Sequence, residues 1–236
     1  MRAVSGRAFC ACLAALLAPC VHAHHVAGLV TPKTFGAGLL SGLGHPVIGL
    51  GSLAFLLAIG LWCAQTRQPE RRPTGLTSAT LALPALLAGT AAGGLLEAAG
   101  LVLPVDDLLV AISVIAGGML LWVSRRSASP LEPLSPLSPL SPGSILPIAV
   151  AIGMAAVAHG MVAAEGSAGA TGGPLLAYWI GILLMQIALW FAAFRLAAAL
   201  MASRPLVAKW AGAIGAVAVM LAGATLIVYP GATLSA

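Results

Sequence analysis

Charged side chains are scarce in this sequence, and their scarcity excludes an ordinary soluble domain. Soluble domains carry about 25% Asp, Glu, Lys and Arg, whereas these residues make up 7% of the 236-residue chain. Hydrophobic residues account for 60%, and the mean hydropathy is +1.05. We therefore expect an integral membrane protein. The net charge of +5 comes from Lys and Arg in a few loops, so it gives no reason to expect nucleic-acid binding.

Cysteine is also nearly absent from the part that is expected to fold. Residues 1–23 have a basic start at Arg2 and Arg7, then a short apolar run, then "VHA". This order is typical of a secretory signal peptide cleaved after Ala23. Cleavage would leave Cys63 as the one cysteine, which excludes an intrachain disulfide. The alternative is an uncleaved N-terminal anchor.

Long apolar runs, by contrast, are abundant. A membrane-spanning helix needs about 20 apolar residues, and the sequence predicts six such helices, at 36–63, 76–98, 107–123, 145–166, 174–200 and 206–229. Residues 127–144 repeat Leu-Ser-Pro, and proline at this density favours an extended linker. We therefore expect an all-α membrane protein with a periplasmic segment at 24–35 and two three-helix halves, 36–126 and 145–236. A 3+3 inverted repeat is compatible with this layout.

The basic residues favour one orientation in the membrane. They fall in alternate loops, at Arg67, Arg71, Arg72, Arg125, Arg126, Arg204 and Lys209. Of the loops expected on the other side, only the first carries a basic residue, Lys33. Because cytoplasmic loops are enriched in Lys and Arg, we expect a bacterial inner-membrane protein with a cytoplasmic linker and with both termini in the periplasm.

Ionisable residues within the spans are few and fall at a similar depth. Each costs about 2.5–3.5 kcal/mol at the centre of a spanning helix, and they are His45, Glu97, Asp106, Asp107, His159 and Glu165. All lie in the outer half of the predicted spans, which indicates a polar site open to the periplasm. Glu97 and Glu165 lie near helix C-termini, where a carboxylate needs a compensating cation or proton. Asp106 and Asp107 are better explained as N-caps.

"GHPVIG", residues 44–49, is unusual in a spanning helix. Pro46 either kinks a helix that has already begun or starts a new one, and Gly44 and Gly49 permit close approach of another helix. We expect His45 near the N-terminal end of its span, where the helix dipole favours the neutral, metal-binding imidazole. The alternative is a histidine hydrogen-bonded to a neighbouring span for packing alone.

A second histidine occurs in "AVAHGMVAAEG", residues 156–166. Gly160 permits close packing next to His159. Met161 and Glu165 share a helix face, whereas His159 and Glu165 do not unless the helix is broken. A purely structural histidine is again the alternative.

His24 and His25 would begin the mature chain, and with a free α-amine they would make a nitrogen cluster for Ni²⁺ or Cu²⁺. The alternative is that they merely flank the cleavage position.

Two segments resemble the HupE/UreJ family, membrane accessory proteins of hydrogenase and urease systems that are regarded as nickel permeases. Residues 35–65 resemble the family's first span, at Phe35, His45-Pro46, Gly49 and Gly60-Leu61-Trp62-Cys63-Ala64-Gln65. Residues 156–166 resemble its second motif, in which a His-Gly is followed by a second His-Gly and a glutamate. This chain departs from the pattern: Gly51-Ser52 replace Asp-His, the second histidine of the later motif is absent, and Glu165 is one place closer to His159.

The resemblance implies a permease that admits a divalent transition-metal cation, nickel first, to supply metalloenzyme maturation. His45 and His159 would be ligands, Glu97 and Glu165 would supply charge, and no cofactor would be permanently bound. Membrane lipid and hydrogenase or urease maturation proteins are the expected partners. No nucleophile–base set indicates an enzyme. The alternatives are a non-transporting scaffold of the same fold, and an electron carrier with a b-type haem held by His45 and His159.

Overall fold

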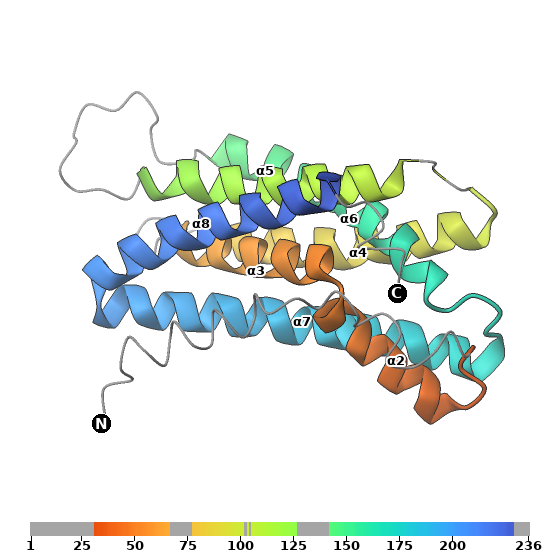
Figure 1. The fold of residues 1–236 in the computed structure, drawn as a ribbon. Helices are drawn as coiled ribbons and strands as arrows, with labels where there is room; N and C mark the ends of the chain where they lie inside the picture. Colours follow the sequence, from red (N-terminus) through yellow and green to blue (C-terminus); the bar gives the residue numbers. More distant parts are fainter. Residues whose placement is uncertain (1–30, 67–76, 102, 104, 127–141, 229–236) are drawn as a thin grey trace.

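The computed structural model describes residues 31–66, 77–101, 103, 105–126 and 142–228. These residues form seven helices and no strand: α2 (Phe35–Ile48), α3 (Leu50–Gln65), α4 (Ser78–Ala98), α5 (Asp106–Arg126), α6 (Pro142–Glu165), α7 (Gly172–Ser203) and α8 (Pro205–Val228) (Figure 1). The predicted signal peptide, His24 and His25 lie outside the described residues, as do residues 127–141 of the linker. The last three linker residues, 142–144, are helical, because Pro142 begins α6.

The first predicted span is not one straight helix. α2 and α3 meet at Gly49 with a bend of 72°. Pro46 lies inside α2 and has no N–H for the carbonyl of Gly42. α2 ends two residues later, where the Gly49 N–H bonds to the carbonyl of His45 at 3.0 Å. Pro46 therefore lies in a helix that has already begun, which is the first of the two alternatives that the sequence left open, and the predicted span over 36–63 is broken at Gly49.

Helices of spanning length and apolarity make this a multi-pass membrane protein. Five unbroken segments of the described chain qualify: Ser78–Ala98, Asp106–Ser124, Ile145–Glu165, Gly172–Ser203 and Trp210–Val228. The bent pair α2–α3 brings the total to as many as six if it counts as one span. Many large apolar side chains on these helices are exposed, as expected for a surface that faces lipid.

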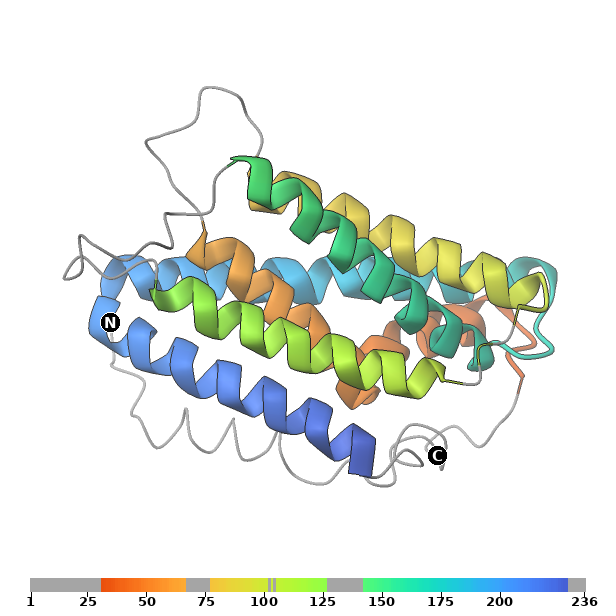
Figure 2. The ribbon, with the colours of Figure 1, turned by 90° about the horizontal axis from the view of Figure 1, so that it is seen from above.

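The most extensive helix contacts join the two halves of the chain. α4 packs against α6, α2 against α7, and α5 against α8. Figure 2 shows α4 beside α6 on one flank and α5 beside α8 on the other, with α3 between them. If α2 and α3 are counted as one span, the second span of each half packs against the first span of the other half, and the two third spans pack against each other. The pairing is therefore the same seen from either half.

Glycine allows these helices to approach closely. A side chain at Gly42 of α2 would overlap the backbone of Tyr178, and one at Gly93 of α4 would overlap the backbone of Val157. In the α5–α8 pair, a Cβ at Gly118 would lie 2.9 Å from the Ala216 carbonyl oxygen. Small residues at such positions are the usual way to bring membrane helices together.

α3 lies at the centre of the bundle and contacts α4, α5, α7 and α8. Ten of its sixteen residues are buried, including Phe55 and Trp62. α2, in contrast, buries only Gly38, Gly42 and Pro46. The bend at Gly49 thus separates a peripheral helix, which carries His45, from a central helix, whose Ser52 contacts His159.

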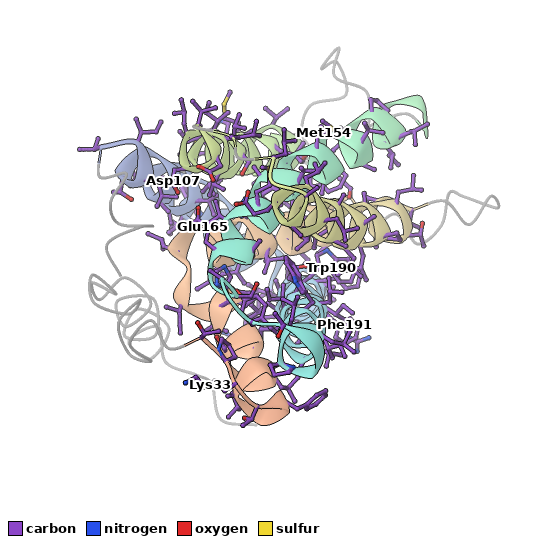
Figure 3. All side chains as sticks on the ribbon, turned by 90° about the vertical axis from the view of Figure 1, so that its right-hand side faces the viewer. Lys33, Asp107, Met154, Glu165, Trp190 and Phe191 are labelled. Carbon is purple, nitrogen blue, oxygen red and sulfur yellow. The ribbon has the colours of Figure 1, made fainter. Side chains whose placement is uncertain are left out.

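The two ends of the bundle differ in charge. Glu97, Asp106, Asp107 and Glu165 lie where α4 and α6 end and α5 begins, and we call this the acidic end. Figure 3 views the molecule from here, with Asp107 and Glu165 close together and Lys33 apart. Arg195 and Arg204 lie toward the opposite end of α7. Asp106 and Asp107 occupy the first turn of α5, where the carboxylate of Asp106 accepts the Asp107 N–H at 2.8 Å.

Candidate functional site

His45 lies in the last turn of α2, so the partly positive helix N-terminus that the sequence predicted beside it is absent. The Tyr178 hydroxyl of α7 is 3.3 Å from His45 Nδ1. The same hydroxyl donates its proton to the carbonyl of Ala163 at 2.6 Å. Because a hydroxyl has one proton, Nδ1 must be the donor to Tyr178. We therefore assign the Nδ1–H tautomer to His45, which puts the ring's lone pair on Nε2.

His159 is buried in the C-terminal third of α6, with 4% of its surface exposed. Its Nε2 is 2.8 Å from the Ser113 hydroxyl of α5, and that hydroxyl donates to the carbonyl of Val110 at 2.7 Å. Nε2 therefore carries the proton and the lone pair is on Nδ1. Ser52 lies 3.4 Å from Nδ1, a long contact in which its hydroxyl is the donor. Phe55 stacks on the ring, with the centroids 4.5 Å apart.

Both histidines are thus anchored by the same relay. In each, one ring N–H donates to a hydroxyl, and the hydroxyl donates to a backbone carbonyl. For His45 this carbonyl belongs to a third helix, α6, whereas for His159 it belongs to α5, the helix of Ser113 itself. Histidines that bind metals usually donate their second ring N–H to a carboxylate, a carbonyl or water, which fixes the tautomer and the ring orientation. The two rings are also near enough to interact electrostatically.

Because of the bend at Gly49, one histidine lies beside a helix C-terminus and the other contacts a residue at a helix N-terminus. His45 belongs to the last turn of α2, where unpaired carbonyls make the C-terminus partly negative. Ser52, which contacts His159, is the third residue of α3, whose N-terminus is partly positive. A cation is therefore favoured beside His45 and opposed beside the Ser52 contact of His159.

The carboxylates form a separate group at the acidic end. Glu165 interacts electrostatically with Asp106, Asp107 and Glu97. It is exposed, whereas Met161 on the preceding turn is fully buried. Within the described part of the chain, no three His, Cys, Asp or Glu side chains are arranged to hold a metal ion together. The structure therefore places Glu97 and Glu165 near one another and the two histidines near one another, but does not join the four into one centre.

The surroundings of Gly51 and Ser52, where this chain departs from the family's Asp-His, agree with the residues found there. A Cβ added to Gly51 would lie 2.7 Å from Cγ1 of Val110 and 3.2 Å from Cδ1 of Leu226. An aspartate here would consequently require the side chains of Val110 and Leu226 to shift. Ser52, where the resemblance implies a histidine, uses its hydroxyl to contact His159.

The glycines of the two motifs differ in their surroundings. A Cβ at Gly160 would overlap the backbone of Thr90 in α4, so this glycine is needed for the α4–α6 contact. Around Gly44 and Gly49, an added Cβ would meet only atoms of Ile48, His45 and Ser52 close by in sequence. Close approach of α2 to α7 instead uses Gly38 and Gly42.

Sequence reasoning missed the residues that hold the two rings. Tyr178 is one of only two tyrosines in the chain and lies in a span with few other polar residues, so the sequence did contain a signal for it. Ser113 and Phe55 gave none, because a single serine or phenylalanine is ordinary in a membrane helix. Gly166 was also missed: a Cβ there would lie 2.5 Å from the Tyr178 hydroxyl and 3.3 Å from His45 Nδ1.

Comparison with known proteins gives one result. A family model described as HupE / UreJ protein matches residues 12–226, which is most of the chain. No curated protein and no solved structure matches it.

Proposed function

Because the chain belongs to the HupE/UreJ family, we propose that it is an inner-membrane permease that admits a divalent transition-metal cation, nickel first, from the periplasm. The family is one of membrane accessory and transport proteins rather than a known class of enzymes. The cation is the cargo, supplied to the maturation of a metalloenzyme such as hydrogenase or urease. In this proposal both termini are periplasmic and the residue 127–144 linker is cytoplasmic.

The observation that carries the proposal is the shared relay on His45 and His159. A neutral histidine that donates from one ring nitrogen keeps on the other the lone pair that a metal ion needs. Here the same N–H to hydroxyl to carbonyl arrangement occurs on two helices from the two halves of the chain. Neutral imidazole nitrogen is a preferred ligand of nickel, copper and zinc.

The polar groups define an order for the cation. Glu97 and Glu165 attract it to the acidic end, where His24 and His25 would collect it if the chain is cleaved after Ala23. His45 takes it first, because the C-terminal carbonyls of α2 lie on that side. His159 takes it next, through Nδ1, after the long Ser52 contact opens. Such weak, stepwise binding suits permeation, because a tight centre would not release its ion.

The test is uptake of radioactive nickel by cells that express the protein. Wild type is compared with His45→Ala, His159→Ala and, as the control, Met154→Ala on the exposed side of α6, at matched protein levels. We expect uptake in wild type and in the control, and a fall of about tenfold or more in each histidine variant, since metal affinity changes by about 10–100-fold even for residues behind the ligands. No uptake above empty-vector cells, for nickel or cobalt, would overturn the permease.

A non-transporting scaffold is the second candidate, and one observation favours it. Both ring nitrogens of His159 already have hydroxyl partners, and Gly51 has lost the space for a carboxylate. The scaffold predicts normal assembly and no effect of His45→Ala on metal uptake. The b-haem alternative fits less well, because the His159 ring is bonded at both nitrogens and stacked on Phe55. A Soret band in purified protein would revive it.

A further inference from the structure

The buried face of α7 carries polar groups at several depths. Tyr178, Ile182, Gln186 and Trp190 recur every four residues, and each is at most 5% exposed. At about 1.5 Å per residue, Tyr178 and Trp190 are roughly 18 Å apart along the helix axis. Tyr178 contacts His45 near the acidic end. The face therefore leads from the first histidine toward the opposite end of the bundle.

Gln186 is the polar residue in the middle of this face. Its Nε2 donates to the Thr90 hydroxyl of α4 at 3.1 Å. Its side-chain carbonyl oxygen is buried and has no hydrogen-bond partner among the described residues. A buried acceptor left in this state carries the full cost of its desolvation. In a membrane span such a group is a functional candidate, because packing alone would favour an apolar side chain.

Thr90 connects Gln186 to the histidine site. Thr90 is fully buried, and its backbone packs directly against Gly160, the neighbour of His159. Beyond Gln186, Trp190 lies beside the thiol of Cys63, which also neighbours Ser78. The hydroxyls of Ser78 and Thr66 follow, 2.7 Å apart. Polar groups thus continue past His159 and along α3 and α4 to the end opposite the acidic residues.

We propose that the side-chain carbonyl oxygen of Gln186 is an inner coordination step for the transported divalent cation, reached from His159 and oriented by Thr90. This inference rests on the proposed permease function. A neutral amide oxygen binds a divalent cation more weakly than a carboxylate, so the ion is passed inward instead of being held. The amide NH₂ cannot bind the ion, and its bond to Thr90 keeps it turned away.

The experiment substitutes Gln186→Met, which keeps the length and removes the oxygen. The matched control is Gln65→Met, because the Gln65 side-chain oxygen is also buried and unpaired, whereas its amide nitrogen lies toward Gly212 of α8, away from the α7 face. Radioactive nickel uptake and equilibrium nickel binding to the purified protein are both measured. We expect Gln186→Met to lower uptake about tenfold or more while leaving equilibrium binding at the histidines within about twofold, and Gln65→Met to change neither.

Gln186→Glu separates coordination from packing. A carboxylate at this depth holds the cation, so we expect it to bind more nickel at equilibrium than wild type and to release it slowly, with reduced uptake. If Gln186→Met transports like wild type, or if both Gln186 variants lose binding and uptake together, the inner step is wrong. His159→Ala, assayed beside them, keeps the two ideas distinct: loss of uptake there with normal uptake in Gln186→Met overturns the inner step and leaves the permease standing.

Discussion

His45 and His159 have the same chemistry and occupy the first helix of their respective halves, yet their surroundings differ. His45 is half-buried in the last turn of a short peripheral helix that ends at a bend. His159 is 4% exposed in an uninterrupted helix and is held by Ser52, Ser113 and Phe55. Their tautomers are opposite, with the lone pair on Nε2 in His45 and on Nδ1 in His159. One ring lies half-buried at the end of a peripheral helix, and the other is part of the core.

The difference teaches that two histidines in similar motifs can contribute differently to the stability of the fold. How much each contributes depends on how tightly its helix is packed. A bend ends α2 just after His45, so the last carbonyls of that helix lie on the His45 side. A continuous helix packed through Gly160 fixes His159 on every side. We therefore expect His45→Ala and His159→Ala to reduce transport to a similar extent but to lower the free energy of unfolding by different amounts.

The largest expected effect is the loss of stability in His159→Ala. We expect it to lower the free energy of unfolding by roughly 2–4 kcal/mol, because Ser52 and Ser113 lose their partner and a cavity opens beside Phe55. His45→Ala should cost less than about 1 kcal/mol, because the ring is only partly buried and its hydrogen bond to Tyr178 is long. Thermal unfolding of the purified proteins in one detergent measures both. Equal losses would remove the distinction between the two sites.

A smaller effect is expected where α3 passes α5. Gly51→Ala puts a Cβ 2.7 Å from Val110 Cγ1, and this overpacking should cost roughly 1–3 kcal/mol. The matched change on the His45 side is Gly44→Ala, where the new Cβ meets only Ile48 Cδ1 at 3.4 Å and should be tolerated. Val110→Ala combined with Gly51→Ala should restore part of the loss. If Gly51→Ala and Gly44→Ala unfold at the same temperature, the close contact between Gly51 and Val110 does not limit the size of the residue at position 51.

The smallest expected effect concerns the anchors of the two rings. Tyr178→Phe removes the hydroxyl between His45 and the carbonyl of Ala163, at a cost of about 1 kcal/mol. Because His45 Nδ1 loses its acceptor, both tautomers become populated, and the nickel concentration for half-maximal uptake should rise about twofold. Ser113→Ala tests the corresponding anchor of His159 in the same assay. An unchanged concentration dependence in Tyr178→Phe would show that this relay does not orient His45.

Much of the helical layout followed from the sequence, because long apolar runs and proline spacing act locally. The bend did not, since "GHPVIG" allowed Pro46 either to start a helix or to kink one. In the structure α2 begins at Phe35 and packs on α7 through Gly42, so Pro46 falls inside a helix. The two histidines were found because charge and imidazole are rare in apolar runs. Ser113 and Phe55 were not, because their importance arises from proximity to His159 across more than forty residues of chain.

The pairing of helices also has a consequence for biogenesis. The most extensive contacts of α2, α4 and α5 are made with α7, α6 and α8, all of which follow the residue 127–144 linker. During synthesis the first half therefore enters the bilayer before any of its principal partners exists. Contacts within the first half, such as those between α3 and α5, can form at that stage, and we expect the rest of the bundle to assemble after the second half is inserted.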